Sequence, residues 1–192
     1  MVALTKFTED DLLDAAEKVI TASGLESASI AAIARAAGAP NGSLYHRFPS
    51  RKHLFGALWV RIATSYRITL TDAMSGPVND PRRLAETVVK LTFEWVELNP
   101  SRAEMLMRFR TEDFVAGDWP QEVLDQIQAT NAALATELVK IASQLKLNPI
   151  DVTLALIDIP ATAARRSLLL RNPEATVHLR KRAIQLSQSL LS

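Results

Sequence analysis

Apolar residues recur along most of the chain at spacings of three and four positions, which is the period of a helix buried on one side. In the segment 9–23 these positions share one face, and Gly24 follows as a helix stop. They are Leu12, Ala16, Val19 and Ile20. No segment shows the alternation of a half-buried strand. The pattern therefore predicts an all-α protein of about nine helices.

Proline marks many of the predicted helix starts, because it is tolerated in the first turn and a preceding Asn or Asp can cap the helix. This arrangement occurs at Asp80-Pro81, Asn99-Pro100, Asn148-Pro149 and Asn172-Pro173. Near the N-terminus, Thr8 and Asp11 have the spacing of a capping box. Pro160 instead lies inside the helical run 154–166, so we expect a kink or a local break there.

A short predicted helix at residues 41–48 has an unusual outer face. It is barely two turns long, and a helix this short must be held by its neighbours. If Leu44 and Phe48 define its buried face, the positions that point away from the core are small or polar. They are Gly42, Ser43 and His46, with Tyr45 and Arg47 on the two flanks.

The preceding segment completes a helix-turn-helix pattern. A second helix is predicted to begin after Ser29 and to end at the turn residue Gly38, directly before the short helix. Such a pair can place the short helix in the DNA major groove. Gly42 would then allow close backbone approach, and Ser43 and His46 would reach base edges. An exposed histidine is, however, often only a surface residue.

Phosphate contacts are expected around this helix. Tyr45 can donate to a phosphate from the flank, and Ser29 with the amides after it forms a helix N-terminus that favours anions. Arg51 and Lys52, at the start of the predicted fourth helix, can neutralise backbone charge.

Charge is distributed unevenly along a chain whose net charge is only +1, from 22 basic and 21 acidic residues. Residues 8–26 carry six acids and one base, whereas residues 29–54 carry four bases and no acid. The acid-free window contains the predicted recognition helix. It favours nucleic acid as a partner over another protein.

Composition excludes several other classes of site. The chain has no Cys, which rules out disulfides and thiolate chemistry, and its three scattered His residues show no metal-ligand spacing. No nucleophile elbow or phosphate-binding loop is present. No apolar run approaches roughly 18 residues, so no membrane span is expected. We therefore expect a cytoplasmic protein that is not an enzyme and needs no cofactor.

Residues 7–58 resemble the DNA-binding domain of TetR-family transcriptional regulators. The resemblance rests on the order of Ala15-Ala16, Gly24, Ser29, Ile33-Ala34, Ala37-Gly38, Gly42, Leu44-Tyr45, Phe48 and Leu54. It implies a homodimeric repressor that binds a palindromic double-stranded DNA operator and is released by a small-molecule effector. By this resemblance the DNA-binding residues are Ser29, Asn41, Gly42, Ser43, Tyr45, His46, Arg51 and Lys52.

Two domains follow from this interpretation: residues 1–54 for DNA binding, and residues 55–192 for effector binding and dimerisation. Pro40 and Asn41 stand where the family often has Ser and Lys, so operator preference is expected to differ there. The alternative function is a helical ligand-binding or protein-interaction module without DNA binding.

Large apolar side chains in the second domain are candidates for an effector pocket, because aromatic and Met side chains line adaptable pockets between helices. They are Trp59, Phe93, Trp95, Met105, Phe109, Phe114 and Trp119. The alternative is ordinary core packing. Eight acids between residues 94 and 125 would suit a cationic ligand, or would simply form solvated helix faces.

The last two predicted helices combine apolar stripes with small residues such as Ala161 and Ala164. By family resemblance they form the dimer interface, a four-helix bundle in which each surface contacts its own copy. The alternative is packing within one chain.

Overall fold

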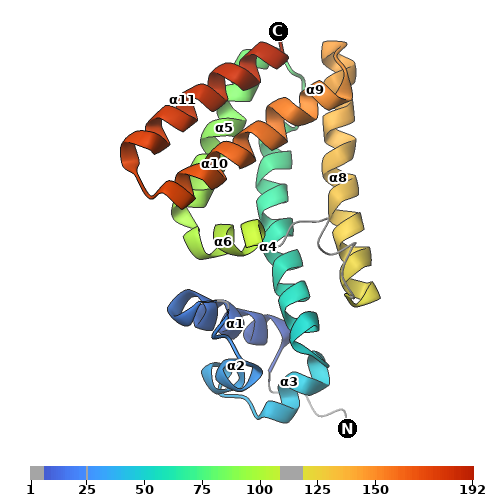
Figure 1. Ribbon diagram of the computed structural model, residues 1–192. Helices are drawn as coiled ribbons and strands as arrows, with labels where there is room; N and C mark the ends of the chain where they lie inside the picture. The colour runs from blue at the N-terminus through green and yellow to red at the C-terminus, as the bar shows by residue number, and fades with distance from the viewer. Residues whose placement is uncertain (1–6, 25, 109–118) are drawn as a thin grey trace. The chain divides into compact units, whose positions relative to one another are not determined.

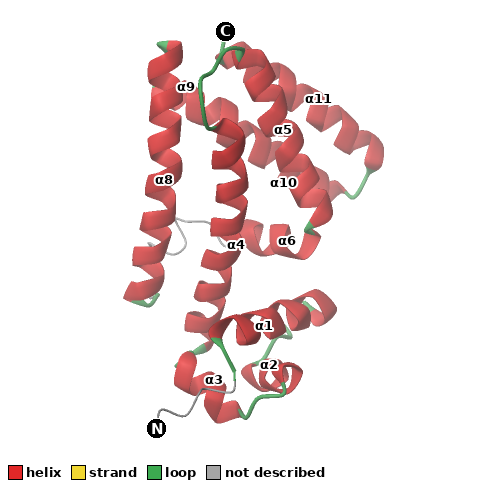
Figure 2. Ribbon diagram, turned by 180° about the vertical axis from the view of Figure 1, so that it is seen from behind, coloured by secondary structure: helices red, strands yellow, loops and turns green. Residues whose placement is uncertain are grey.

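The computed structural model describes residues 7–24, 26–108 and 119–192. Within these ranges every regular element is a helix and no strand occurs (Figure 2). With the run Pro149–Leu170 counted as one interrupted helix, the described residues hold nine helices. The predicted all-α class is confirmed.

The chain divides into two compact units. Unit 1 comprises Met1–Ala63 and Glu104–Ile127, and unit 2 comprises Thr64–Ala103 and Gln128–Ser192. The predicted domain boundary at residue 54 lies within unit 1 and stays a prediction.

Unit 1 contains the predicted N-terminal helices, coloured blue to cyan in Figure 1. They are α1 (Glu9–Ser23), α2 (Ile30–Ala37), α3 (Asn41–Arg47) and the first part of α4 (Arg51–Met74). The capping box at the start of α1 is confirmed: the Asp11 amide donates to Thr8 Oγ1 at 3.1 Å, and the Thr8 amide donates to Asp11 Oδ2 at 2.8 Å. Helix α2 packs against both α1 and α3.

Unit 2 and the segments that continue into it contain the remaining helices. They are α5 (Pro81–Leu98), α6 (Pro100–Arg108), α8 (Gln121–Leu145), α9 (Pro149–Thr153), the π-helical turn η1 (Leu154–Asp158), α10 (Ile159–Leu170) and α11 (Pro173–Leu190). Helices α10 and α11 pack on each other and on α5 (Figure 1). The buried core between these elements includes Val88, Phe93, Ile141 and Leu156.

The Asx-Pro pattern gives the helix starts correctly. Helices α5, α6, α9 and α11 begin at Pro81, Pro100, Pro149 and Pro173. The carboxylate of Asp80 accepts from the Arg83 amide at 3.0 Å, and the amide oxygen of Asn172 accepts from the Ala175 N–H at 3.0 Å. Each cap satisfies an N–H that the helix itself leaves unpaired.

The expected break at Pro160 takes the form of the π-turn η1. The Ile159 N–H donates to the Leu154 carbonyl, five residues back rather than four. Pro160, the next residue, has no N–H to donate and stands in the first turn of α10. The wider turn therefore carries the helix past a residue that cannot continue the regular hydrogen-bond ladder.

Candidate nucleic-acid interface

Helices α2 and α3 are joined by a short turn that starts at Gly38. Ser29 caps α2, because its Oγ accepts from the Ala32 amide at 3.1 Å. Gly38 has φ of 64°, a left-handed conformation that favours glycine, and its N–H bonds the carbonyl of Ala34. The turn thus ends α2 and allows α3 to begin at Asn41.

Helix α3 is held on its predicted inner face. Leu44 is fully buried and Phe48 is 4% exposed, so the two anchors predicted from their spacing are confirmed as core. On the outer side Tyr45 keeps 54% of its surface exposed, although an aromatic ring ordinarily gains by burial. Asn41, Gly42 and His46 are also exposed, and Ser43 is half-buried. The face offered to solvent is the one predicted to meet DNA.

Gly42 leaves an open space on this face. No atom of the described residues outside its own turn lies within 4 Å of the position that a Cβ would take. Its φ is not in the left-handed region, so backbone conformation does not require glycine either. Glycine inside a helix costs about 0.5–1 kcal/mol relative to alanine. The cost fits a position where another molecule approaches the backbone.

Arg51 links the start of α4 to the start of α2. Its Nε donates to the carbonyl of Ala28 at 3.3 Å, and its guanidinium lies 4.5 Å from the centre of the Phe55 ring. The structure therefore brings Arg51 beside the capped N-terminus at Ser29, which creates a positive region suited to a phosphate. Lys52 follows, with an exposed side chain.

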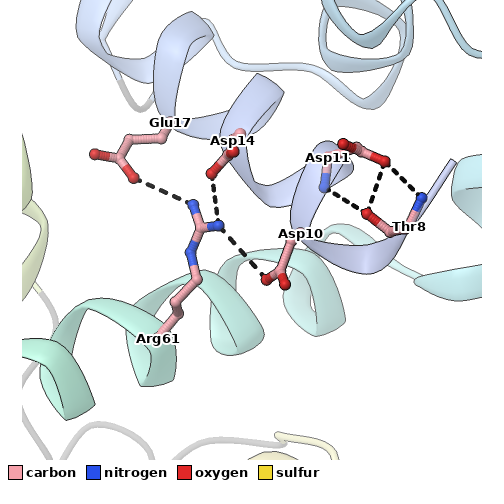
Figure 3. A network of polar contacts seen from close by, with 6 residues as sticks. All are labelled: Thr8, Asp10, Asp11, Asp14, Glu17 and Arg61. Carbon is pink, nitrogen blue, oxygen red and sulfur yellow. Dashed lines mark hydrogen bonds and ion pairs between the residues drawn. The ribbon is translucent and has the colours of Figure 1, made fainter.

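A second tie inside unit 1 joins α4 to α1 (Figure 3). Arg61 Nη1 lies 2.7 Å from Asp14 Oδ1 and 3.8 Å from Asp10 Oδ1, and Nη2 lies 3.2 Å from Glu17 Oε2. One guanidinium thus serves three of the carboxylates in the acidic segment of α1. The sequence did not reveal this role, because the partners are more than forty positions apart.

The candidate effector residues divide between the two units. Trp59 and Met105 are buried in unit 1, and Trp119 is half-buried there. Phe93 is buried and Trp95 half-buried in unit 2. Phe109 and Phe114 lie outside the described residues. The burial of the five described residues is compatible with core packing as well as with a pocket, so the assignment stays a prediction.

Polar contacts accompany these aromatic residues in unit 2. The hydroxyl of Tyr66 donates to Thr92 Oγ1 at 3.1 Å, and the Thr92 hydroxyl donates in turn to the Val88 carbonyl at 2.9 Å. The Tyr66 and Trp95 rings lie 4.6 Å apart between centres. Burial raises the pKa of Tyr66 to about 12, so its hydroxyl stays protonated and acts as a donor at neutral pH. Sequence reasoning missed Tyr66 and Thr92.

A groove of about 680 Å³ runs along α10 and α11 in unit 2. Apolar side chains and four charged ones line it: Leu154, Asp158, Ile159, Arg165, Arg166, Leu169, Leu179, Arg182 and Leu186. None of the predicted effector residues that the structure describes lines this groove. It lies on the two helices that were predicted to form the dimer interface.

The described part of the chain shows neither a cluster of metal ligands nor a membrane-spanning helix. No three acidic or histidine side chains there are grouped as metal ligands. No helix in the same ranges is both long enough and apolar enough to cross a bilayer.

Comparison with known proteins gives a family match at the N-terminal helices. Residues 12–58 match the family model of bacterial regulatory proteins of the tetR family. The matched segment includes α2, the turn at Gly38 and α3. A comparison with curated proteins gave no match.

Several solved structures share the fold over nearly the whole chain. A TetR family transcription regulator from Marinobacter aquaeolei VT8 is 16% identical, with a TM-score of 0.65, over 95% of this chain and 94% of that one. A TetR transcription regulator from Haloarcula marismortui is 14% identical, with a TM-score of 0.70, over 94% and 96%. FadR from Bacillus subtilis, solved in complex with stearoyl-CoA, is 12% identical, with a TM-score of 0.67, over 95% and 98%. At sequence identities this low, the structural similarity establishes a shared fold and nothing more specific.

Proposed function

We propose that this protein is a ligand-responsive, DNA-binding transcriptional regulator, because residues 12–58 match the model of the tetR family of bacterial regulatory proteins and the chain has the fold of TetR-family transcription regulators. It acts as a homodimeric repressor on a palindromic operator, and a small-molecule effector releases it.

The exposed face of α3 carries the proposal. A two-turn helix is anchored by Leu44 and Phe48, while the open backbone of Gly42 and the side chain of His46 are left facing outward. No acidic residue occurs between residues 29 and 54, so nothing on these elements repels a phosphate backbone. A protein partner would not require either feature.

The residues divide into two roles. Ser43 and His46 read base edges in the major groove, next to Gly42. The other proposed contacts bind phosphate and set the position of the helix on the duplex. They are Ser29, Tyr45, Arg51 and Lys52, with Asn41 at the first position of α3 where operator preference departs from that of relatives.

The effector is proposed to bind among the regulatory helices. The candidate contacts form two separate groups, each within one unit: Trp59, Met105 and Trp119 in unit 1, and Phe93 and Trp95 in unit 2. Helix α4 begins in unit 1 and continues into unit 2, so a shift of α4 on effector binding would change the position of α3 on DNA. Linkage requires that operator lowers effector affinity by the factor by which effector lowers operator affinity. Equal effector affinities with and without operator, measured by calorimetry, would contradict this coupling.

DNA binding is tested with duplexes from the region upstream of the gene. Affinity is measured against salt concentration for the wild type, for His46→Ala and for the matched control His178→Ala, an exposed histidine on α11. We expect the logarithm of affinity to fall linearly with the logarithm of salt concentration, and His46→Ala alone to reduce discrimination between operator and unrelated DNA. A flat salt response would favour a ligand-binding module without DNA binding.

A further inference from the structure

The outer face of the continuous run formed by η1 and α10 carries leucines and charged side chains at spacings that are symmetric about its middle. Leu154 and Asp158 belong to η1, Arg165 and Leu169 belong to α10, and Ala161-Thr162 lies midway between the two pairs. Each leucine is four positions from its charged neighbour, and each charged residue is three positions from the nearer central residue. Within the helix, Leu169 lies about 20° around the axis from Asp158, so these side chains form one narrow stripe.

This stripe is open to solvent within the chain. Leu154 is 38% exposed and Leu169 is 62% exposed, which is unusual for two leucines on one helix face. Both line the groove described above, together with Asp158, Thr162 and Arg165.

The two charged groups lack ion-pair partners among the residues that the structure describes. No ion pair there includes Asp158 or Arg165. Two arginines of the adjacent helix α11 do have partners within the chain: Arg180 pairs with Glu97, and Arg182 donates to Gln185 Oε1 at 3.0 Å. Asp158 and Arg165 therefore remain available to a second molecule.

We propose that the run of η1 and α10 pairs antiparallel with the same run of a second copy about a two-fold axis between Ala161 and Thr162. Leu154 then faces Leu169 of the partner subunit, and Asp158 faces Arg165 of the partner subunit, each contact occurring twice by symmetry. The small residues at the axis allow the two backbones to approach. This register rests on the homodimer proposed above and specifies the contacts that select it.

A register shifted by one residue is the main competitor. It would place Asp158 opposite Arg166 and Leu154 opposite Leu170 of the partner subunit. Arg166 and Leu170 lie about 100° further round the helix than Arg165 and Leu169, so the shifted pairs do not share the stripe. Leu170 also lies outside the set of residues that line the groove.

Charge reversal separates the two registers. Asp158→Arg and Arg165→Asp are purified separately, and sedimentation velocity gives the dimer dissociation constant of each variant alone and of their mixture. Each variant alone places like charges opposite each other twice, so the constant should rise on the order of 100-fold. Mixed, the two variants place opposite charges at both contacts and should form a heterodimer near wild-type strength.

Arg166→Asp is the matched control, since it reverses the neighbouring exposed arginine. Its mixture with Asp158→Arg should give no comparable heterodimer. The double variant Asp158→Arg with Arg165→Asp should regain the homodimer, which keeps the test valid if a single variant folds poorly, and circular dichroism checks folding throughout.

Each outcome decides between the two claims. A wild type that stays monomeric on DNA and in solution overturns the homodimer and this register with it. A dimeric wild type whose Asp158→Arg variant is rescued by Arg166→Asp, or by neither partner variant, overturns the register and leaves the homodimer intact.

Discussion

Gly42 is the residue at which folding and function make opposite demands. Its Cβ position is open and its backbone is ordinary helix, so alanine fits without strain. We expect Gly42→Ala to raise the free energy of unfolding by about 0.5–1 kcal/mol, measured by urea denaturation.

The same change should weaken operator binding, because a methyl group would stand between the helix and the DNA surface. Fluorescence anisotropy with a labelled operator measures this loss. A variant that is more stable and binds operator as tightly as the wild type would show that DNA does not approach the backbone at Gly42.

At this scale the sequence predicts some residues and misses others for a physical reason. Leu44 and Phe48 were predictable because two residues four positions apart share a helix face whatever the rest of the chain does. Tyr66 and Arg61 were missed because their partners lie 26 and 44 to 51 positions away, and only the packing of helices brings them together.

Among the elements, α1 shows how a local cap depends on pH. The hydrogen bond to the Thr8 side chain, and then that to the Thr8 backbone, hold the pKa of Asp11 below its ordinary value. A carboxyl whose pKa is lowered by folding stabilises the folded state above its ordinary pKa, and this contribution disappears as the pH falls through the folded-state value.

Thr8→Val keeps the shape of the residue and removes the hydroxyl. We expect the pKa of Asp11 to rise toward its ordinary value, followed by carbon NMR of the carboxyl group during an acid titration. The variant should also lose less stability than the wild type between neutral and acid pH. An unchanged pKa of Asp11 in the variant would mean that the Thr8 hydroxyl contributes little to the capping box.

The contacts of Arg61 on α4 with three carboxylates of α1 contribute to the packing of these two helices. Its carboxylate partners are largely exposed except Glu17, so each pair is weak and screened by salt. We expect Arg61→Ala to lower the free energy of unfolding by about 1 kcal/mol at low salt and by less at high salt.

Lys90→Ala is the matched control for this measurement, because Lys90 pairs with Glu86 within a single helix. Its loss should be a few tenths of a kcal/mol. If both variants lose the same amount at every salt concentration, the three contacts of Arg61 do not act together.

The starts and ends of elements were more predictable than their partners. Asn172 and Pro173 specify a helix start through neighbouring atoms alone, and the structure confirms it. Which helix α11 packs against depends on the complete set of apolar faces, and no local pattern encodes that choice. The effector residues show the same limit, since burial at Phe93 does not separate core from pocket.

For the whole molecule, the proposed dimer fixes the geometry of its operator. Two recognition helices that enter successive major grooves lie about one helical turn apart, roughly 34–36 Å. Inserting about half a turn of DNA, roughly five base pairs, between the half-sites should reduce affinity to that of a single half-site, whereas a full-turn insertion keeps both sites on one side of the duplex.

Electrophoretic mobility shifts with the three duplexes measure this dependence. Indifference to the half-turn insertion would indicate that each subunit binds its half-site independently. The operator would then be read by monomers, and the arrangement of the two copies would not contribute to recognition.

The π-turn at Leu154–Asp158 has a consequence for divergence between related regulators. A turn closed by a bond five residues back holds one residue more than an ordinary α-helical turn. Deleting one residue there would restore the ordinary turn, and the residues before it would keep nearly the same orientation relative to α10. A related regulator that lost this single codon would therefore still present Leu154 on the face that carries Arg165 and Leu169.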